Sequence, residues 1–178
     1  MSVATNSIPS APPAGNCILI CEDDPLIALG WSGLLIDAGY TVVGPAYRAE
    51  KALEMAYRHL PTLALIDIDL GGTIDGISVA AELAPLGVAV VFITADYKRA
   101  AVEGREFAAD ILIKPVTEST VLRSIAAILQ RKQGAELAAV LNWVDARNWM
   151  VFRGQWAVVW RRPRFREGLP RWGRSRRW

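Results

Sequence analysis

The chain has 178 residues, of which 52% are hydrophobic and 21% are charged, and its formal net charge is +2. This length suits one ordinary globular domain better than a two-domain enzyme, and the apolar content excludes a largely disordered chain. No uninterrupted apolar run approaches the roughly 20 residues that cross a bilayer, so we expect no integral membrane segment. The first 16 residues lack Lys and Arg, unlike a secretory signal. We therefore expect residues 1–15 to be a disordered leader on a cytoplasmic protein.

The charge is unevenly distributed along the chain. Residues 1–142 carry ten Lys and Arg against 16 Asp and Glu, whereas residues 143–178 carry ten Arg against two acidic residues. Six of the seven tryptophans also fall in this basic C-terminal segment. The body of the chain and its C-terminal end are therefore interpreted separately.

Short apolar runs alternate with longer helical patterns in the body of the chain. This alternation is typical of βαβ units and a parallel sheet, and runs that are apolar throughout indicate strands covered by helices on both faces. Five strands are expected, at Cys17–Cys21, Thr41–Val43, Leu63–Ile66, Val88–Ile93 and Ile111–Ile113. Even spacing places Cys17 and Cys21 on one face of the first strand, where we expect buried, reduced thiols.

A segment with helical periodicity follows each expected strand. The first runs from Leu26 to a stop at Gly39, and the third ends at Pro85. The other three lie at about 52–56, at about 98–107, and from Thr117 onward. The order β-α, five times over, predicts an α/β fold.

Polar and ionisable residues follow the expected strands where each strand ends. They are Glu22, Asp23 and Asp24 after the first, Asp67 after the third, Thr94 after the fourth and Lys114 after the fifth. Ligands of open α/β sheets bind outside these ends. Clustered carboxylates require a cation, and oxygen-only ligands favour Mg²⁺. Thr94 and Lys114 are suitable donors to a phosphoryl group, and Asp67 suits a nucleophile that forms an acyl phosphate.

Several acidic residues also fit a purely structural role. Asp23 and Asp24 precede Pro25, which suits the first turn of a helix, so each is either a cap or a ligand. We favour the ligand for Asp23 and the cap for Asp24. Asp67 also fits a turn residue at a strand end, although its neighbours favour the nucleophile. Asp75 is interpreted as a turn or cap residue.

Five segments of the body occur in a defined order, and four of them carry these strand-end residues. They are Ile18–Pro25, Leu63–Leu70, Asp75–Gly76, Phe92–Ala95 and Ile113–Pro115. Together they resemble the receiver domain of bacterial two-component response regulators, over residues 16–131. The resemblance implies a flavodoxin-like (βα)5 doubly wound fold, with five parallel strands in the order 2-1-3-4-5. A short irregular C-terminal tail would follow it.

The resemblance also implies a role for each matching residue. Asp67 would be the phosphoacceptor, Lys114 the cation that binds the phosphoryl group, and Thr94 the hydroxyl that follows it on activation. The Mg²⁺ ligands would be Glu22, Asp23, Asp67 and the backbone carbonyl of Asp69. The protein would be a signalling module rather than an enzyme, acting in a phosphorelay. A histidine kinase or histidine phosphotransfer protein would phosphorylate it, and an unknown output protein would bind its changed surface.

Three departures from the family's pattern affect these expectations. Gly71 and Gly72 stand where many receivers have proline, which makes the loop more permissive without removing a ligand. Ile111 occupies the position where the family often has a switching aromatic residue. The carboxylates of Asp69 and Asp96 add negative charge near the site, which increases its dependence on the metal.

The C-terminal extension, residues 132–178, is too short for the winged-helix output domain of many regulators. Leu137, Val140, Leu141 and Val144 favour either a longer last helix or a short additional one. The remainder mixes arginine and tryptophan without steady periodicity. We interpret it as a poorly ordered extension. The alternative is a regulator whose basic aromatic tail binds nucleic acid under control of the receiver, or that lies on an anionic membrane surface.

Overall fold

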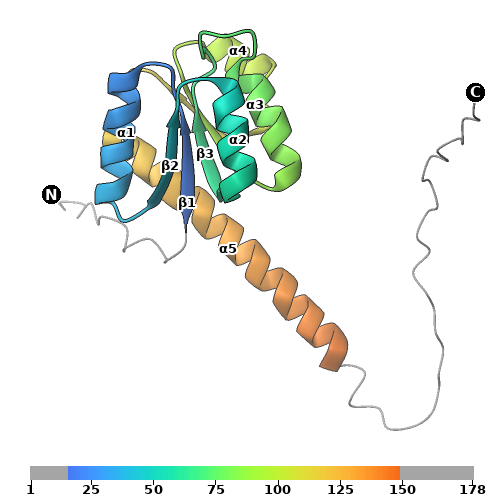
Figure 1. The fold of residues 1–178 in the computed structure, drawn as a ribbon. Coiled ribbons are helices and arrows are strands. Elements are labelled where there is room, and N and C mark those ends of the chain that lie inside the picture. Colours follow the sequence, from blue (N-terminus) through green and yellow to red (C-terminus); the bar gives the residue numbers. More distant parts are fainter. Residues whose placement is uncertain (1–15, 149–178) are drawn as a thin grey trace, which may run out of the picture. The chain divides into compact units, whose positions relative to one another are not determined.

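The computed structural model describes the backbone of residues 16–148 and the side chains of residues 16–140. In chain order the elements are β1 (Cys17–Cys21), α1 (Pro25–Asp37), β2 (Thr41–Ala46), α2 (Ala49–His59), β3 (Leu63–Ile66), α3 (Gly76–Leu83), a 3₁₀ turn (Ala84–Leu86), β4 (Ala89–Thr94), α4 (Tyr97–Val102), β5 (Ala108–Ile113) and α5 (Glu118–Asn148). The predicted alternation of strands and helices is confirmed (Figure 1).

The strands form one parallel sheet in the order β2-β1-β3-β4-β5, as the resemblance implied. In the register of the central strands, Cys21 of β1 pairs with Ile66 of β3, which pairs with Phe92 of β4. The carboxyl ends of β1 and β3 therefore lie side by side. This register brings Glu22, directly after β1, beside Asp67, directly after β3.

Helices cover both faces of the sheet (Figure 1). On one face, α1 and α5 pack through residues such as Leu35 and Ile125 against Ile18 and Ile20 of β1. On the other, α2, α3 and α4 pack against a second apolar cluster that includes Cys21. Successive residues of a strand point to opposite faces, so the two clusters are separated by the sheet. Both faces are buried, as parallel sheets require.

The two cysteines lie on one side of the sheet, as predicted. Cys21 belongs to the apolar cluster under α2 and α3, and Cys17 packs against the same cluster. Burial, reinforced by the nearby carboxylates, raises the pKa of the Cys21 thiol to about 12. Cys21 is therefore a thiol that packs in the core, with little tendency to react as a thiolate.

Aspartates cap three of the helices, and at α4 the cap is Asp96, which accepts from the backbone N–H of Arg99 at 3.0 Å. Asp24 caps α1, because its Oδ1 accepts hydrogen bonds from the backbone N–H groups of Leu26 at 2.8 Å and Ile27 at 3.2 Å. Asp75 caps α3 and accepts from the backbone N–H of Ser78 at 2.9 Å. Both predicted caps are confirmed. They fix where α1 and α3 begin relative to the strand ends.

Three strands differ from their predicted ranges. β2 continues through Gly44 to Ala46, and β5 begins three residues earlier than expected, at Ala108. Both are edge strands of the sheet, where glycine, proline and polar residues are tolerated. An apolar pattern therefore underestimates their length. β4 runs over Ala89–Thr94, so Thr94 is its last residue rather than the one after it.

Helix α5 continues to Asn148, so the predicted boundary at residue 131 falls inside a helix and residues 132–148 are not irregular. Gly134 costs helix stability relative to alanine but leaves the backbone hydrogen bonds intact. Of the two forms considered for this segment, the longer last helix is correct. The predicted leader, residues 1–15, and residues 149–178 lie outside the described part of the chain. Within residues 16–148, no helix is both long enough and apolar enough to span a membrane.

Candidate functional site

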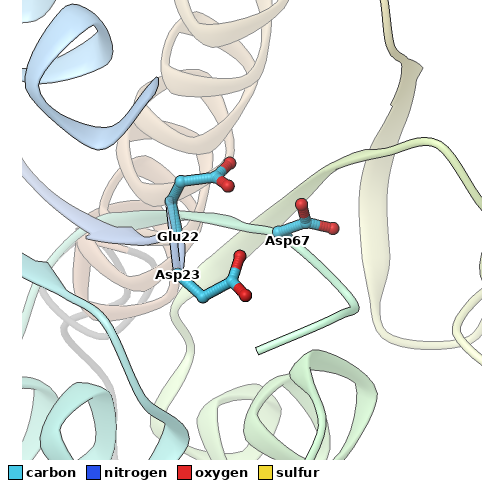
Figure 2. A group of neighbouring side chains, drawn as sticks. All are labelled: Glu22, Asp23 and Asp67. Carbon is cyan, nitrogen blue, oxygen red and sulfur yellow. The ribbon is translucent and has the colours of Figure 1, made fainter. Parts of the chain in front are cut away.

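Three carboxylates meet at the carboxyl ends of β1 and β3. Glu22 and Asp23 directly follow β1, and Asp67 directly follows β3. Each offers one oxygen within 4.8 Å of the oxygens of the other two, and Figure 2 shows the three side chains gathered at neighbouring strand ends. Glu22 and Asp67 are 2% and 8% exposed, whereas Asp23 is exposed. Of these three carboxylates, two are therefore buried and one is open to solvent.

Lys114 forms ion pairs with both buried carboxylates. Its Nζ lies 2.5 Å from Asp67 Oδ2 and 2.8 Å from Glu22 Oε2. The backbone N–H of Lys114 donates to the carbonyl of Thr94 at 3.0 Å, which extends the β4–β5 pairing to the lysine itself. The lysine thus reaches the acidic site from two strands away, past the end of β4.

The ion pairs and the burial have opposing electrostatic effects. Burial raises the pKa of the Glu22 carboxyl above its ordinary value, and the Lys114 ammonium offsets only part of this shift. Burial also disfavours the Lys114 ammonium, but its hydrogen bonds to Asp67 and Glu22 outweigh that cost and raise the pKa of Lys114. The lysine is therefore held as a cation at neutral pH, between two acidic side chains.

The donor set fits a hard divalent cation. Lys114 contacts one oxygen of Glu22 and one of Asp67, which leaves each carboxylate a second oxygen. Among the described residues, no lysine, arginine or histidine forms an ion pair with Asp23. Oxygen ligands of this kind suit Mg²⁺, which takes few protein carboxylates and keeps several waters. Gly71 borders the same site, because a Cβ at this residue would lie 3.4 Å from Asp23 Oδ2.

Thr94 lies at the same edge of the sheet but outside this ion-pair network. The residue is fully buried, and its hydroxyl accepts a hydrogen bond from the backbone N–H of Asp96 at 3.0 Å. In the described part of the chain, no hydrogen bond joins Thr94 to Asp67 or to the Lys114 ammonium. The hydroxyl here stabilises the turn between β4 and α4.

Asp69 lies in the loop that leaves the end of β3. Its backbone N–H donates to Oδ1 of Asp67 at 3.3 Å, and its side chain is 71% exposed. The backbone of Asp69 is thus directly linked to the Asp67 carboxylate. Its side chain points away from the buried part of the site, so the carboxylate does not join the group of three.

Two contacts that support the site were not predicted from the sequence. A Cβ at Gly76 would overlap the carbonyl oxygen of Asp67 and would lie 2.8 Å from Ile66 Cγ2. Arg99 of α4 bonds to Asp75, which caps α3. The close backbone approach at Gly76 has no local sequence signal beyond the glycine itself. The Arg99 contact joins residues 24 positions apart, so no spacing rule could indicate it.

The surroundings of Trp31 and Ile111 differ. Trp31 of α1 lines a small hollow together with Glu22 and Asp67, and its indole Nε1 is buried without a hydrogen-bond partner among the described residues. Ile111, at the position of the family's frequent aromatic switch, packs against the apolar cluster that contains Phe92. Trp31 therefore lies close to Glu22 and Asp67, whereas the side chain of Ile111 contributes to packing.

The parallel sheet and the acidic site at its strand ends are those expected of a receiver domain. In agreement, the family model described as response regulator receiver domain matches residues 18–126. The chain belongs to the response regulator receiver family, as its sequence motifs implied. Receiver domains are signalling modules that are generally not enzymes, and they typically carry a phosphoacceptor and bind Mg²⁺ at an acidic pocket.

Characterised regulators share this part of the chain. The transcriptional regulatory protein PdtaR of Mycobacterium tuberculosis is 33% identical over 117 residues, which cover 64% of this chain and 57% of PdtaR. The phyllosphere-induced regulator PhyR of Methylorubrum extorquens is 33% identical over 120 residues, covering 66% of this chain and 45% of PhyR. The similarity therefore extends over only about half the length of each regulator.

Solved receiver structures share the fold. The signal receiver domain of a modulated diguanylate cyclase from Desulfovibrio desulfuricans is 34% identical and superposes with a TM-score of 0.61. The match covers 66% of this chain and 95% of that one. The match therefore spans almost the whole of that domain.

Proposed function

We propose that Asp67 is the phosphoacceptor of this receiver and that the chain acts in a two-component phosphorelay. The observation that carries this proposal is the Lys114 ammonium 2.5 Å from Asp67 Oδ2, with oxygens of Glu22 and Asp23 alongside. A nucleophilic carboxylate beside a fixed cation is the arrangement that transfer of an anionic phosphoryl group requires.

The transfer consists of one bond made and one broken. A carboxylate oxygen of Asp67 attacks the phosphorus of a phosphohistidine, a phosphorus–oxygen bond forms, and the phosphorus–nitrogen bond breaks. The released imidazole nitrogen takes up a proton. Lys114 offsets the negative charge on the phosphoryl oxygens. Its two present partners, Asp67 and Glu22, lose part of that contact when the phosphoryl group arrives.

Mg²⁺ fits the oxygen ligands that surround Asp67. The ion would be held by the carboxylates of Glu22, Asp23 and Asp67 and by the backbone carbonyl of Asp69. When bound, it supplies positive charge that offsets the charge of the phosphoryl oxygens. Because Glu22 is buried and Asp23 is exposed, Glu22 anchors the inner side of this site, and Asp23 contributes a ligand at its open side.

The response to phosphorylation starts at Thr94 in this proposal. Its hydroxyl now accepts from Asp96 N–H, so moving it toward a phosphoryl group on Asp67 would release the β4–α4 turn. That movement would alter the face made by α4, β5 and α5. Ile111 would follow by repacking, since its side chain offers no hydroxyl.

The donor would be a histidine kinase or a histidine phosphotransfer protein, and the output would be a protein that binds the altered face. This chain would then signal by changed interactions and would not catalyse a reaction on an external substrate. The names of PdtaR and PhyR as regulators support this role. A cytoplasmic location remains a prediction.

Intact-mass spectrometry of the full chain tests the assignment of Asp67. Incubation with a small acyl-phosphate donor and Mg²⁺ should add one phosphoryl group to the wild type and to Asp69→Asn, which keeps its backbone carbonyl. Asp67→Asn should take none, because the amide is a poor nucleophile. Equal labelling of the wild type and Asp67→Asn would refute the assignment.

A second candidate function rests on the composition of residues 143–178, with ten Arg, two acidic residues and six of the seven tryptophans. Basic and aromatic side chains together bind single-stranded nucleic acid by charge and stacking. In that case the full chain would bind DNA or RNA with an affinity that falls steeply with salt, and deleting residues 149–178 would abolish binding. Absence of binding even at low salt would eliminate this candidate.

A further inference from the structure

The loop between β3 and α3, residues 67–75, carries two of the proposed metal ligands, and its residue Ile74 packs against the apolar core. Ile68 and Leu70 are 0% and 2% exposed, and the backbone N–H of Gly76 donates to the carbonyl of Ile68 at 2.8 Å. Between these anchors the chain passes through Gly71, whose φ is +61°, and Gly72. Glycines restrain a backbone weakly, so side-chain contacts decide how firmly the loop is held.

Arg99 supplies such contacts from another element. From α4, its Nη2 bonds to Oδ2 of Asp75, and its Nη1 lies 3.7 Å from Oδ1 of Asp69. The same Nη2 lies 3.5 Å from Oε2 of Glu103, one turn along α4. In the described part of the chain, Arg99 is the only basic residue that pairs with carboxylates of this loop other than Asp67. A single guanidinium therefore joins α4 to both halves of the loop.

Of these ion pairs of Arg99, the one with Asp75 is the more firmly fixed. Asp75 also accepts hydrogen bonds from the backbone N–H and the hydroxyl of Ser78, at 2.9 Å and 2.8 Å, so its carboxylate is fixed by the first turn of α3. The Asp69 side chain is 71% exposed, and an exposed pair contributes little by itself. Asp75 thus orients the guanidinium, whose other nitrogen faces Asp69. Contacting Asp75 and Asp69 at once requires two separate nitrogens in one planar group, which the guanidinium of arginine has and the ammonium of lysine lacks.

We propose that Arg99 is a positioning residue for the metal site. It holds the loop that carries Asp67 and Asp69 in the arrangement that Mg²⁺ requires, and it acts through Asp75 without touching the ion or the phosphoryl group. The inference rests on the proposed function of Asp67. Because α4 begins three residues after Thr94, the same contact ties the metal loop to the segment that would respond to phosphorylation.

A purely electrostatic effect of Arg99 on Mg²⁺ affinity would have the opposite sign to a positioning effect. Removing a positive charge near an acidic site strengthens the binding of a divalent cation through the long-range field. Loss of a positioning contact weakens it, because residues that orient metal ligands commonly contribute tenfold or more in affinity. The sign of the change therefore separates a positioning role from a general electrostatic one. Lys98, an exposed lysine one residue earlier in α4, is a matched control for charge.

Calorimetric titration of MgCl₂ into the full chain measures this sign. Arg99→Gln should weaken Mg²⁺ binding about threefold to tenfold, whereas Lys98→Gln should leave it unchanged or slightly tighter. Arg99→Lys should fall between the wild type and Arg99→Gln, because it keeps the charge but loses one of the two contacting nitrogens. Amide hydrogen exchange without Mg²⁺ should be faster over residues 68–75 in Arg99→Gln than in the wild type, with β1 and β3 unaffected.

Two sets of results would contradict the inference in distinguishable ways. Wild-type or tighter Mg²⁺ binding by Arg99→Gln, with unchanged exchange in the loop, would overturn the role of Arg99 while leaving Asp67 as the acceptor. A wild-type chain that neither binds Mg²⁺ nor takes a phosphoryl group would overturn the proposed function and this inference with it. If Arg99→Gln fails to fold, the Mg²⁺ affinity of Arg99→Lys tests the inference instead. Equal Mg²⁺ affinities of Arg99→Lys and the wild type would refute the need for a guanidinium at residue 99.

Discussion

The ammonium nitrogen of Lys114 lies 2.5 Å from Oδ2 of Asp67, although the two residues are 47 positions apart. The same nitrogen lies 2.8 Å from Glu22 Oε2, so one cation pairs with two nearly buried carboxylates. Its removal leaves those carboxylates unpaired and close together, which is costly in a low-dielectric environment.

Lys114→Met should therefore lower the free energy of unfolding by about 3 kcal/mol in the absence of metal. Mg²⁺ should restore part of this loss, because the ion can take over the neutralisation of Glu22 and Asp67. Urea unfolding with and without MgCl₂ measures both effects. Lys51→Met serves as the control, since Lys51 is an exposed lysine that pairs with Glu54 within α2. A loss in Lys114→Met no larger than in Lys51→Met would contradict the account.

Neighbouring aspartates should respond differently to substitution. Asp23→Ala should weaken Mg²⁺ binding severely, because it removes a proposed ligand. Asp24→Ala should leave Mg²⁺ affinity nearly unchanged and lower the free energy of unfolding by about 1 kcal/mol, because it removes the cap of α1. Fluorescence of Trp31, which lines a hollow with Glu22 and Asp67, reports the binding, most clearly when the tail tryptophans are replaced by phenylalanine. Indistinguishable Mg²⁺ affinities for the two variants would reverse the choice of ligand.

Thr94 should be needed for the response but not for phosphoryl transfer. Thr94→Ala should accept a phosphoryl group on Asp67, yet it should show no change in amide exchange over residues 94–114 when beryllium fluoride is added. Thr94→Ser keeps the hydroxyl that now accepts from Asp96 N–H, so it should retain the response. Ile111→Val should be mild, since Ile111 only packs. An equal response in the wild type and Thr94→Ala would assign the switch to another residue.

The same substitution at two glycines should have opposite effects. Gly76→Ala should lower the free energy of unfolding by about 3 kcal/mol, because its Cβ would overlap the backbone of Asp67. Gly33→Ala should raise it by about 0.5–1 kcal/mol, because this exposed position inside α1 has open space around it. Denaturant unfolding compares the two variants. A neutral Gly76→Ala would mean that the backbone of Asp67 can move aside freely.

Asp75 should make folding sensitive to acid. Partial burial opposes the shift, but hydrogen bonds from Ser78 and Arg99 hold the pKa of Asp75 below its ordinary value of 3.8. The folded protein then binds this proton less readily than the unfolded chain does. The resulting stabilisation is complete above the unfolded-state pKa and is lost as the pH falls through the folded-state pKa. Asp75→Asn keeps a capping oxygen but does not titrate, so its stability deficit should shrink on acidification from about pH 6 to pH 3. A deficit independent of pH would contradict the contribution of the Asp75 carboxylate.

Local patterns in the sequence determined the alternation of strands and helices and the gathering of functional side chains at one edge. Buried parallel strands are short apolar runs, and their carboxyl ends meet at one side of the sheet, so residues such as Asp67 and Lys114 could be assigned to a common site. Caps are equally local, because Asp24 and Asp75 bond to N–H groups two or three residues ahead. The edge strands were underestimated because an edge tolerates residues such as Pro45 and Asp110.

Tertiary structure alone decided the contacts between elements distant in the chain. The Lys114 ion pairs with Glu22 and Asp67 depend on the register of β1, β3 and β5, and the bond between Arg99 and Asp75 depends on how α4 lies beside α3. The need for glycine at residue 76 follows from the nearby backbone of Asp67. The physical reason is the same in each case. Apolar periodicity and capping reflect interactions over a few residues, whereas ion-pair geometry and close backbone approaches arise only when separate elements pack together.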